Sequence, residues 1–457
     1  MADPSRPEPA AQLSVFDAVV IMLGLVVGIG IFRTPSIVAS GVGSEAMFIL
    51  VWLLGGLVTL IGALCYAELA AAHPHVGGEY HFLSQAYGRS VARLFAWARC
   101  TVIQTGSIAI VAFLLGDYVA QAAPLGPLGP AIYAAVAVVV LTAVNVAGTV
   151  AGKNLQIAVT GIQLGAMLAI ILVGFFGSAG VVAPAPLPVR EEAAALGVAM
   201  IFVLLTYGGW NDAAYLTGEL RDAPRNIAKV LTVGTALLVL LYVLANMALL
   251  SILGLDGLRA SDAVAADMMR AAAGPSGELL VTLAIVVAAI ATLNATLFTG
   301  ARVFFALGRD VAVLRWIGVW NGRGSAPANG LIAQGGLALV LIALGAFTPD
   351  GFKAMVDYTA PVFWLFLLLV GGSLFVLRWR HPHRAMPFRV PFYPLTPIVF
   401  CLTCLYMLHA SVLHTGHAAW AGLGVLMAGV PMLFCKDSTA TCEAPVLTSS
   451  HSPGDSP

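Results

Sequence analysis

Hydrophobic residues occur along this chain in long runs, separated by glycine, proline and charged residues. Each run is about 20 residues long, which is the length a helix needs to cross the hydrocarbon core of a bilayer. The pattern predicts an all-α integral membrane protein. Its twelve predicted transmembrane helices cover residues 15–39, 45–72, 91–121, 129–147, 155–177, 194–218, 228–254, 277–307, 330–347, 353–378, 395–414 and 417–435.

The two ends of the chain differ from these runs. Residues 1–14 are polar and proline-rich, and they lack the pattern of a signal peptide. Residues 436–457 are rich in Ser, Thr and Pro. Both ends carry too little apolar surface to fold. They are predicted to be disordered tails flanking a single transmembrane domain over residues 15–435.

Composition agrees with a bilayer setting, because 60% of residues are hydrophobic and only 10% are charged. The net charge is zero, which argues against a nucleic-acid partner. If both tails share one side, 17 of the 22 Lys and Arg residues fall on that side: Arg6, Arg89, Arg93, Arg99, Lys153, Arg221, Arg225, Lys229, Arg302, Arg309, Arg315, Arg323, Arg378, Arg380, Arg384, Arg389 and Lys436. The positive-inside rule then places both tails in the cytosol.

The six cysteines fall mostly in apolar runs, where thiols usually serve as small packing residues. Cys401 and Cys404 form a CxxC pair, without the second pair or the nearby histidines of a zinc site. No metal and no cofactor is therefore expected.

Two predicted spans carry glycine pairs near their centres. Gly28 and Gly30 lie in span 1, and Gly208 and Gly209 lie in span 6. Each glycine weakens a helix by roughly 1 kcal/mol relative to alanine, and a break in hydrocarbon needs protein, water or a ligand to satisfy the freed backbone groups. The alternative is that these glycines only allow close helix packing.

Spans 1 and 6 are equivalent if the chain contains two inverted copies of a five-helix unit. The first repeat would cover about residues 15–177 and the second about 194–378, with residues 395–435 forming two further spans. The sequence therefore predicts a 5+5 inverted repeat with broken helices 1 and 6.

The two predicted breaks offer complementary chemistry. New helix N–H groups at Gly28, Ile29 and Gly30 suit a carboxylate. Carbonyl groups at Tyr207–Gly208–Gly209 can accept hydrogen bonds from an ammonium group. One carboxylate site and one ammonium site together describe an α-amino acid.

Several motifs carry a family resemblance. They are VGIGIF at 27–32, the segment from ALCYAEL to SQAYG at 63–88, YGGWNDAAYLTGELRDAPRNIAKV at 207–230, TLNATLFTGARVFFALGRD at 292–310 and LRWRHPHRAMPFRVPFYPLTP at 377–397. In this order they resemble the amino acid/polyamine/organocation transporter superfamily, specifically its L-type amino acid transporter branch. The resemblance implies a fold of the leucine-transporter type and secondary transport of amino acids, often by exchange.

The resemblance also implies roles for single residues. The substrate carboxylate would bind the backbone of Gly28, Ile29 and Gly30. Its ammonium group would bind carbonyls near Val26 and from Thr206 to Gly208. The remaining candidates are Asn211 beside the substrate and Trp210 as a gate or a packing residue.

This chain departs from the family pattern at three positions. Ile29 replaces a serine of the span 1 signature. Leu205 stands where many relatives carry an aromatic gate. Gln163 stands where relatives commonly have lysine, and a neutral amide cannot replace a sodium ion by charge. Gln163 is instead expected to hold span 5 to span 1 by hydrogen bonds. In this fold a sodium ion is usually held between span 1 carbonyls and span 8 oxygens. Segment 283–291 of span 8 supplies no pair of hydroxyl groups for such an ion, so sodium-independent exchange is expected.

Two acidic residues inside spans are functional candidates by default, because burying a charge is costly. Asp212 selects a cationic substrate, faces a cavity on the cytosolic side or pairs with an arginine. Glu68 is a candidate for gating or coupling. Substitution of Gly24 by alanine is expected to be tolerated. Loops 256–275 and 79–90 are expected on opposite sides of the membrane, with Ala265 and Ser84 as accessible positions.

Other functions remain open. The leading expectation is a plasma-membrane L-amino acid permease with no enzymatic activity, since HExxH and GxSxG motifs are absent. A polyamine or amine antiporter of the same superfamily and a non-transporting amino acid sensor are the alternatives. The substrate, proton coupling, accessory subunits and oligomeric state stay open.

Overall fold

The computed structural model describes residues 13–75, 77–147, 153–177, 193–218, 220–311, 314–319, 327–382, 386–413 and 417–433. The prediction of an all-helical protein is confirmed for this part of the chain. The single β-type contact among these residues is an isolated bridge between Leu13 and Leu220. The predicted tails, apart from Leu13 and Ser14, lie outside the described residues.

The first half of the chain forms ten helical elements. They are α1 (Val15–Val26), η1 (Ile29–Phe32), α2 (Thr34–Ser40), α3 (Glu45–Ala72), α4 (Gly78–Tyr87), α5 (Arg89–Ala98), the π-helical η2 (Arg99–Ile103), α6 (Gln104–Ala122), α7 (Gly129–Val146) and α8 (Lys153–Phe176).

The second half continues in the same way. Its elements are α9 (Ala193–Thr206), η3 (Trp210–Gly218), α10 (Ala223–Ala260), α11 (Val264–Asp310), α12 (Ala328–Gly345), α13 (Gly351–Arg380), α14 (Leu395–Leu413), α15 (His417–Ala428) and η5 (Val430–Leu433).

Eight helical stretches of the described chain are long and apolar enough to cross a membrane: Glu45–Ala72, Arg89–Gln121, Gly129–Val146, Ala223–Ala260, Val264–Phe305, Ala328–Gly345, Gly351–Arg380 and Leu395–Leu413. Shorter apolar helices lie at Val15–Val26, Thr160–Phe176 and His417–Leu433. The predicted spans 1 and 6 are each divided into shorter helical pieces.

Two segments expected as loops are helical instead. The region 256–275 is filled by the end of α10 and the start of α11, which bend where Gly254 and Gly274 adopt φ angles of 65° and 69°. Only glycine adopts such angles without strain, so each glycine turns the chain while helical segments continue on both sides. Ala265 is consequently buried rather than accessible. Segment 79–90 likewise contains most of α4, and Ser84 on it is half-buried.

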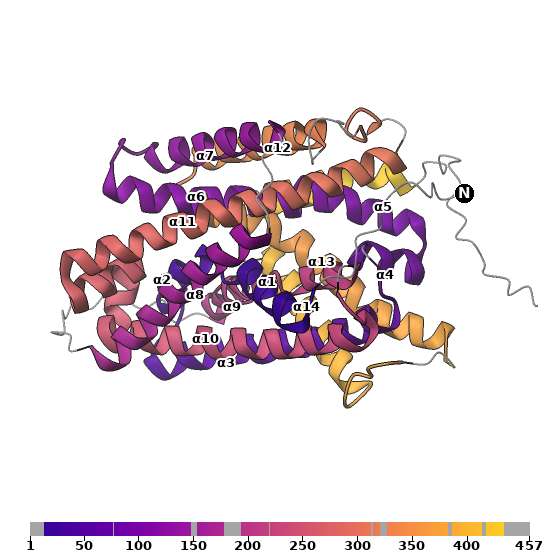
Figure 1. The fold of residues 1–457 in the computed structure, drawn as a ribbon, viewed down its shortest axis with the longest axis horizontal. Helices are drawn as coiled ribbons and strands as arrows, with labels where there is room; N and C mark the ends of the chain where they lie inside the picture. Colours follow the sequence, from indigo (N-terminus) through magenta and orange to yellow (C-terminus); the bar gives the residue numbers. More distant parts are fainter. Residues whose placement is uncertain are drawn as a thin grey trace, which may run out of the picture.

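The long helices run roughly side by side (Figure 1). In this view α7 and α12 form one edge with α6 and α11 beside them, and α3 packs along α10 at the opposite edge. The short pieces α1, α2 and α9 lie between these layers (Figure 1). The interrupted elements thus occupy the interior.

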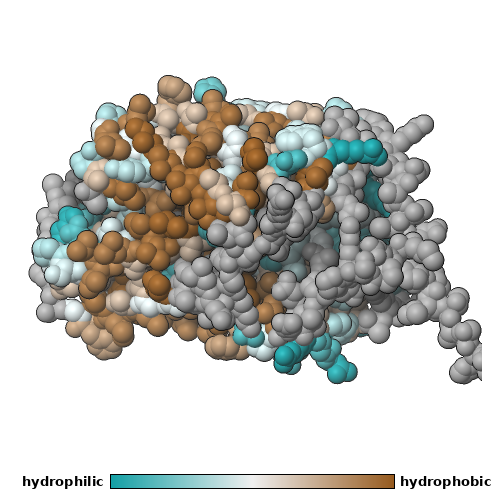
Figure 2. Space-filling view, turned by 45° about the horizontal axis from the view of Figure 1, so that its top comes forward, coloured by the Kyte–Doolittle hydropathy of each residue, from teal (hydrophilic) through white to brown (hydrophobic). Residues whose placement is uncertain are grey.

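The outer surface matches a lipid environment. Figure 2 shows a broad hydrophobic band across the coloured part of the view, with hydrophilic residues mainly at its margins. Large apolar side chains of α10 and α11, such as Leu240 at 54% exposed and Leu280 at 69% exposed, face outward. A protein in water would bury such residues, so the surface indicates a bilayer as solvent.

Candidate functional site

The first helix is interrupted at the glycines of span 1. Helix α1 ends at Val26, Gly28 is extended with φ −90° and ψ −175°, and η1 starts at Ile29. The carbonyl of Val26 accepts hydrogen bonds from the Gly28 amide at 2.6 Å and from the Tyr242 hydroxyl at 2.8 Å. Both lone pairs of this carbonyl are therefore engaged, and Val26 is a poor candidate for an ammonium acceptor.

The sixth predicted span is interrupted in the same manner. Helix α9 ends at Thr206, and Gly209 has a φ angle of 100° that other residues rarely adopt. A Cβ atom on Gly209 would lie 3.4 Å from the carbonyl oxygen of Leu25. The two interruptions therefore touch each other across the interior of the molecule.

A hydroxyl pair links the two interrupted segments a second time. Thr34 Oγ1 at the start of α2 lies 2.7 Å from Thr206 Oγ1 at the end of α9. Thr206 also donates to the Phe202 carbonyl at 2.8 Å, which fixes its rotamer. Thr34 is therefore the donor to Thr206, and the start of α2 is tied to the C-terminal end of α9.

Buried aromatic side chains support both interruptions. Tyr207 and Tyr242 pack with ring centroids 5.1 Å apart, and Trp52 lies 6.0 Å from Tyr207. The Tyr207 hydroxyl donates to the Trp52 carbonyl at 3.2 Å. Residues Trp52 on α3 and Tyr242 on α10 thus pack against Tyr207, which directly follows α9, and hold the interrupted backbone in the buried interior.

A cavity of about 230 Å³ lies beside the two interruptions. Its size is below the roughly 300–1,000 Å³ of clefts that hold drug-sized ligands, so it suits a small molecule. The predicted site residues that line it are Val26, Gly28, Gly30, Leu205, Thr206, Gly208, Asn211 and Asp212. The side chain of Ile29 lies outside the described part of the structure.

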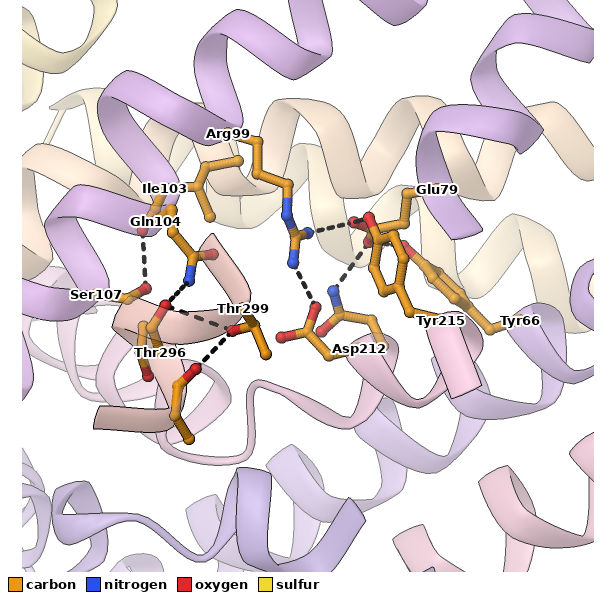
Figure 3. A network of polar contacts seen from close by, with 12 residues as sticks. Tyr66, Glu79, Arg99, Ile103, Gln104, Ser107, Asp212, Tyr215, Thr296 and Thr299 are labelled. Carbon is orange, nitrogen blue, oxygen red and sulfur yellow. Dashed lines mark hydrogen bonds and ion pairs between the residues drawn. The ribbon is translucent and has the colours of Figure 1, made fainter. Parts of the chain in front are cut away.

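A charged network forms part of the cavity lining (Figure 3). Arg99 donates to Glu79 Oε2 at 2.8 Å and to Asp212 Oδ1 at 2.7 Å. Asn211 Nδ2 and the Tyr66 hydroxyl both donate to Glu79 Oε1, at 2.9 Å and 2.7 Å. Asp212 therefore pairs with an arginine, which was one of its three expected roles.

The charges in this network are unequally buried. The side chains of Arg99 and Glu79 are 10% and 5% exposed, whereas that of Asp212 is 37% exposed. Arg99 is the first residue of the π-helical turn η2, a geometry that is frequent at functional sites. The network joins α3, α4, η2 and η3, so it links this part of the cavity lining to four separate elements.

A neutral polar wall lies on the other side of Arg99 (Figure 3). Gln104 Nε2 donates to the Thr296 carbonyl at 2.9 Å, and the hydroxyl of Thr299 donates to the Ala295 carbonyl at 2.8 Å. The lining also has an apolar portion that includes Phe202 and Phe352, whose ring centroids are 6.2 Å apart. The cavity therefore offers a polar region and an apolar region to a ligand.

Other predicted site residues lie away from the cavity lining. Tyr207 belongs to the aromatic cluster, and Trp210 packs against Tyr66 with ring centroids 4.9 Å apart. Glu68 is fully buried and accepts hydrogen bonds from Arg378 at 2.6 Å and 2.5 Å. Trp210 is therefore a packing residue in this conformation, and Glu68 belongs to an ion pair outside the cavity.

Gln163 lies on α8 and faces α11. Its amide donates to Thr292 Oγ1 at 3.1 Å and to the Ala288 carbonyl at 3.4 Å. The expectation that Gln163 holds span 5 to span 1 is corrected, because its bonds go to span 8. Span 1 instead meets span 5 at Gly24, where a Cβ atom would lie 2.1 Å from Thr160 Oγ1. The expected tolerance of alanine at Gly24 is therefore wrong.

Arg99 and Glu79 line the cavity although neither was among the site residues expected from the sequence. Arg99 lies inside predicted span 91–121, and an ionisable residue in a span is itself a signal of function. Glu79 carried no such signal, because it falls between two predicted spans. It lines the cavity because helix α4, on which it lies, packs against the cavity. Within the described chain, no group of three or more His, Cys, Asp or Glu residues is arranged to hold a metal ion.

Comparisons with known proteins agree with this geometry. The model of the amino acid permease family matches residues 13–433. The mouse b(0,+)-type amino acid transporter 1 is 28% identical over 90% of this chain and 84% of its own length. The mouse large neutral amino acids transporter small subunit 2 is 28% identical over 93% of this chain and 80% of its own length.

A further relative, the mouse Asc-type amino acid transporter 1, is 26% identical over 93% of this chain and 80% of its own length. These matches extend across both helix interruptions, the cavity and the charged network. The chain belongs to the amino acid permease family of the amino acid/polyamine/organocation superfamily, and its relatives place it in the L-type branch.

Proposed function

We propose that the protein is a plasma-membrane permease that moves L-amino acids by alternating access, through sodium-independent exchange. The observation that carries this proposal is the meeting of two interrupted helices beside one small cavity. Backbone groups freed in a membrane interior need a partner, and a zwitterion supplies both a donor and an acceptor. The relatives, which are named amino acid transporters, support the same substrate class.

In this proposal the substrate carboxylate binds the amides at Ile29 and Gly30, because the Gly28 amide already donates to the Val26 carbonyl. The start of a helix presents N–H groups without partners inside the helix, together with the positive end of its dipole. The substrate ammonium binds carbonyls at the end of α9, between Thr206 and Gly208. The side chain then extends along the cavity toward its polar or its apolar region.

The proposed architecture has twelve spans in a 5+5 inverted repeat, with both termini in the cytosol. Helices α1 and α9 occupy equivalent positions in the two repeats, and transporters with such repeats bind substrate between broken helices near the membrane midplane. Rocking of one group of helices against the other would expose the cavity to each side in turn.

Sodium independence is supported by Gln163. In relatives of this fold that use sodium, the ion lies between span 1 carbonyls and span 8 oxygens. Here the Gln163 amide already donates to two span 8 oxygens, at Thr292 and Ala288. The amide has no proton to exchange near neutral pH, so it satisfies these oxygens without coupling transport to an ion.

The test is uptake of labelled amino acids into proteoliposomes, with unlabelled amino acid inside or absent. Exchange predicts rapid uptake only when amino acid is inside, unchanged by a sodium gradient. Sodium-driven accumulation into empty vesicles would contradict the sodium claim, and proton-driven accumulation would make the protein a symporter.

Two controls separate the rival functions. Amino acid amides, which lack the carboxylate, should fail to compete, whereas competition by amides or polyamines would favour an amine antiporter. A purified protein that binds amino acids in a thermal-shift assay but catalyses no flux would be a sensor.

A further inference from the structure

A second cleft lies away from the substrate cavity, at the connection between α13 and α14. Its volume is about 610 Å³, and its lining includes Arg378, Trp379, His381, Arg389 and Tyr393. Both helices are candidate membrane spans, ending at Arg380 and beginning at Leu395. The connection between them therefore lies at the membrane surface, where lipid headgroups are found.

The cleft is positively charged and is held in shape by a buried carboxylate. The Glu68 carboxylate accepts hydrogen bonds from the Arg378 guanidinium and, at 2.6 Å, from the Val390 amide. These bonds fix the backbone next to Arg389, whose side chain is exposed. Among the described residues that line the cleft, none is acidic. The positive charge of the cleft that faces solvent is therefore carried by arginine, and His381 adds a polar side chain.

Aromatic side chains form the walls. The guanidinium carbon of Arg378 lies 3.8 Å from the centroid of the Tyr393 ring. The ring centroids of Phe375 and Tyr393 are 5.9 Å apart. Trp379 is 82% exposed at the last turn of α13. Tryptophan and tyrosine are enriched at the membrane–water boundary, where their rings contact both headgroups and chains.

An exposed apolar stripe on α14 begins at Leu395, two residues after Tyr393, which lines the cleft. Leu395, Ile398, Leu402 and Leu405 are 62%, 41%, 59% and 52% exposed. Spacings of three and four residues place them on one face of the helix. A positively charged cleft that continues into an exposed apolar stripe matches a molecule with an anionic head and a hydrocarbon tail.

We propose that this cleft binds an anionic phospholipid, with its phosphate on Arg389 and His381 and one acyl chain along α14. The charge of Arg378 is already neutralised by Glu68, and its guanidinium stacks on the Tyr393 ring that forms one wall of the cleft. Juxtamembrane arginines attract anionic headgroups, and the attraction weakens with salt. The site is separate from the amino acid cavity, so binding can be measured without any transport assay.

The test is native mass spectrometry of the full-length protein, titrated with phosphatidylglycerol or phosphatidylcholine of the same chain length. We expect tighter binding of phosphatidylglycerol, and a loss of about fivefold in its affinity in Arg389→Gln, the effect of one basic residue near a membrane surface. The matched control is Arg225→Gln, because Arg225 is an exposed arginine near the start of another long helix. This control should bind as the wild type does.

Three outcomes would overturn the proposal. One is equal affinity of Arg389→Gln and the wild type for phosphatidylglycerol. Another is an equal loss in Arg225→Gln, which would indicate general surface charge. The third is displacement of the lipid by inorganic phosphate at similar concentrations, which would indicate a free anion site. Circular dichroism checks that each variant is folded.

Discussion

Arg99 is a buried cation whose partners come from two other elements. Its guanidinium bridges Glu79 and Asp212, and the three charges are stable only together. Burying a single charge costs several kcal/mol, whereas a paired and hydrogen-bonded charge recovers most of this cost. The network therefore makes this part of the cavity lining depend on a single arginine.

Replacement of Arg99 by leucine should destabilise the protein strongly. It leaves the carboxylates of Glu79 and Asp212 without their cation, and breaking a buried ion pair costs about 3–5 kcal/mol. Because Asp212 is partly exposed, the lower end of this range is expected. The measurement is unfolding in detergent, by heat or denaturant. Arg225→Leu serves as the control and should cost less than about 1 kcal/mol, because its pair with Asp222 is exposed. Equal losses in both variants would contradict the role of the network.

Gly30 lies on the cavity wall, where a Cβ atom would be 3.7 Å from Thr206 Oγ1. A methyl group therefore fits, but the branched end of leucine would enter the space proposed for the substrate carboxylate. Gly30→Leu should remove the thermal shift caused by amino acids, while its unliganded stability stays close to that of the wild type. Gly165→Leu is the matched control, because Gly165 is exposed on α8 with no atom near its Cβ position. Normal ligand binding by Gly30→Leu would remove the proposed carboxylate site.

At the scale of elements, the contact between α1 and α8 is set by a single missing side chain. Gly24 lets the backbone of α1 approach the buried Thr160. The close approach positions α1 so that its end at Val26 reaches Tyr242 on α10. Small residues at such crossings are common where helices pack in membranes.

Gly24→Ala should therefore be destabilising, although alanine favours helices. Its Cβ atom would lie 2.1 Å from Thr160 Oγ1, so the Thr160 side chain must move or the two helices must shift apart. Overpacking of this kind costs about 1–3 kcal/mol. The measurement is thermal unfolding, with Gly165→Ala as a control that should be neutral or stabilising. A second variant, Gly24→Ala with Thr160→Ala, should recover most of the loss.

The sequence predicted these elements well where long apolar runs define them. It also placed Gly28 and Gly208 in the interior of spans, because glycine in a hydrophobic run is a local signal. It could not reveal the contact between Gly24 and Thr160, or the bonds from Gln163 to α11, because both depend on how distant helices rotate and pack. Glu79 was missed for the same reason.

At the scale of the whole molecule, the distribution of charge predicts one orientation in the membrane. Ala260 at the end of α10 and Gln85 on α4 are exposed, and they should lie on opposite sides. In a variant lacking native cysteines, Ala260→Cys should react with an impermeant thiol reagent in intact cells. Gln85→Cys should react only after the cells are opened. The reverse pattern would invert the topology.

The size of the cavity has a consequence for pharmacology. A space of about 230 Å³ is filled by a compact zwitterion. A bulkier inhibitor must protrude through whichever entrance is open and prevent the helices from closing over it. Such a compound would act from only one face of the bilayer, so inhibitors of this protein should divide into small competitors effective from both faces and large blockers effective from one.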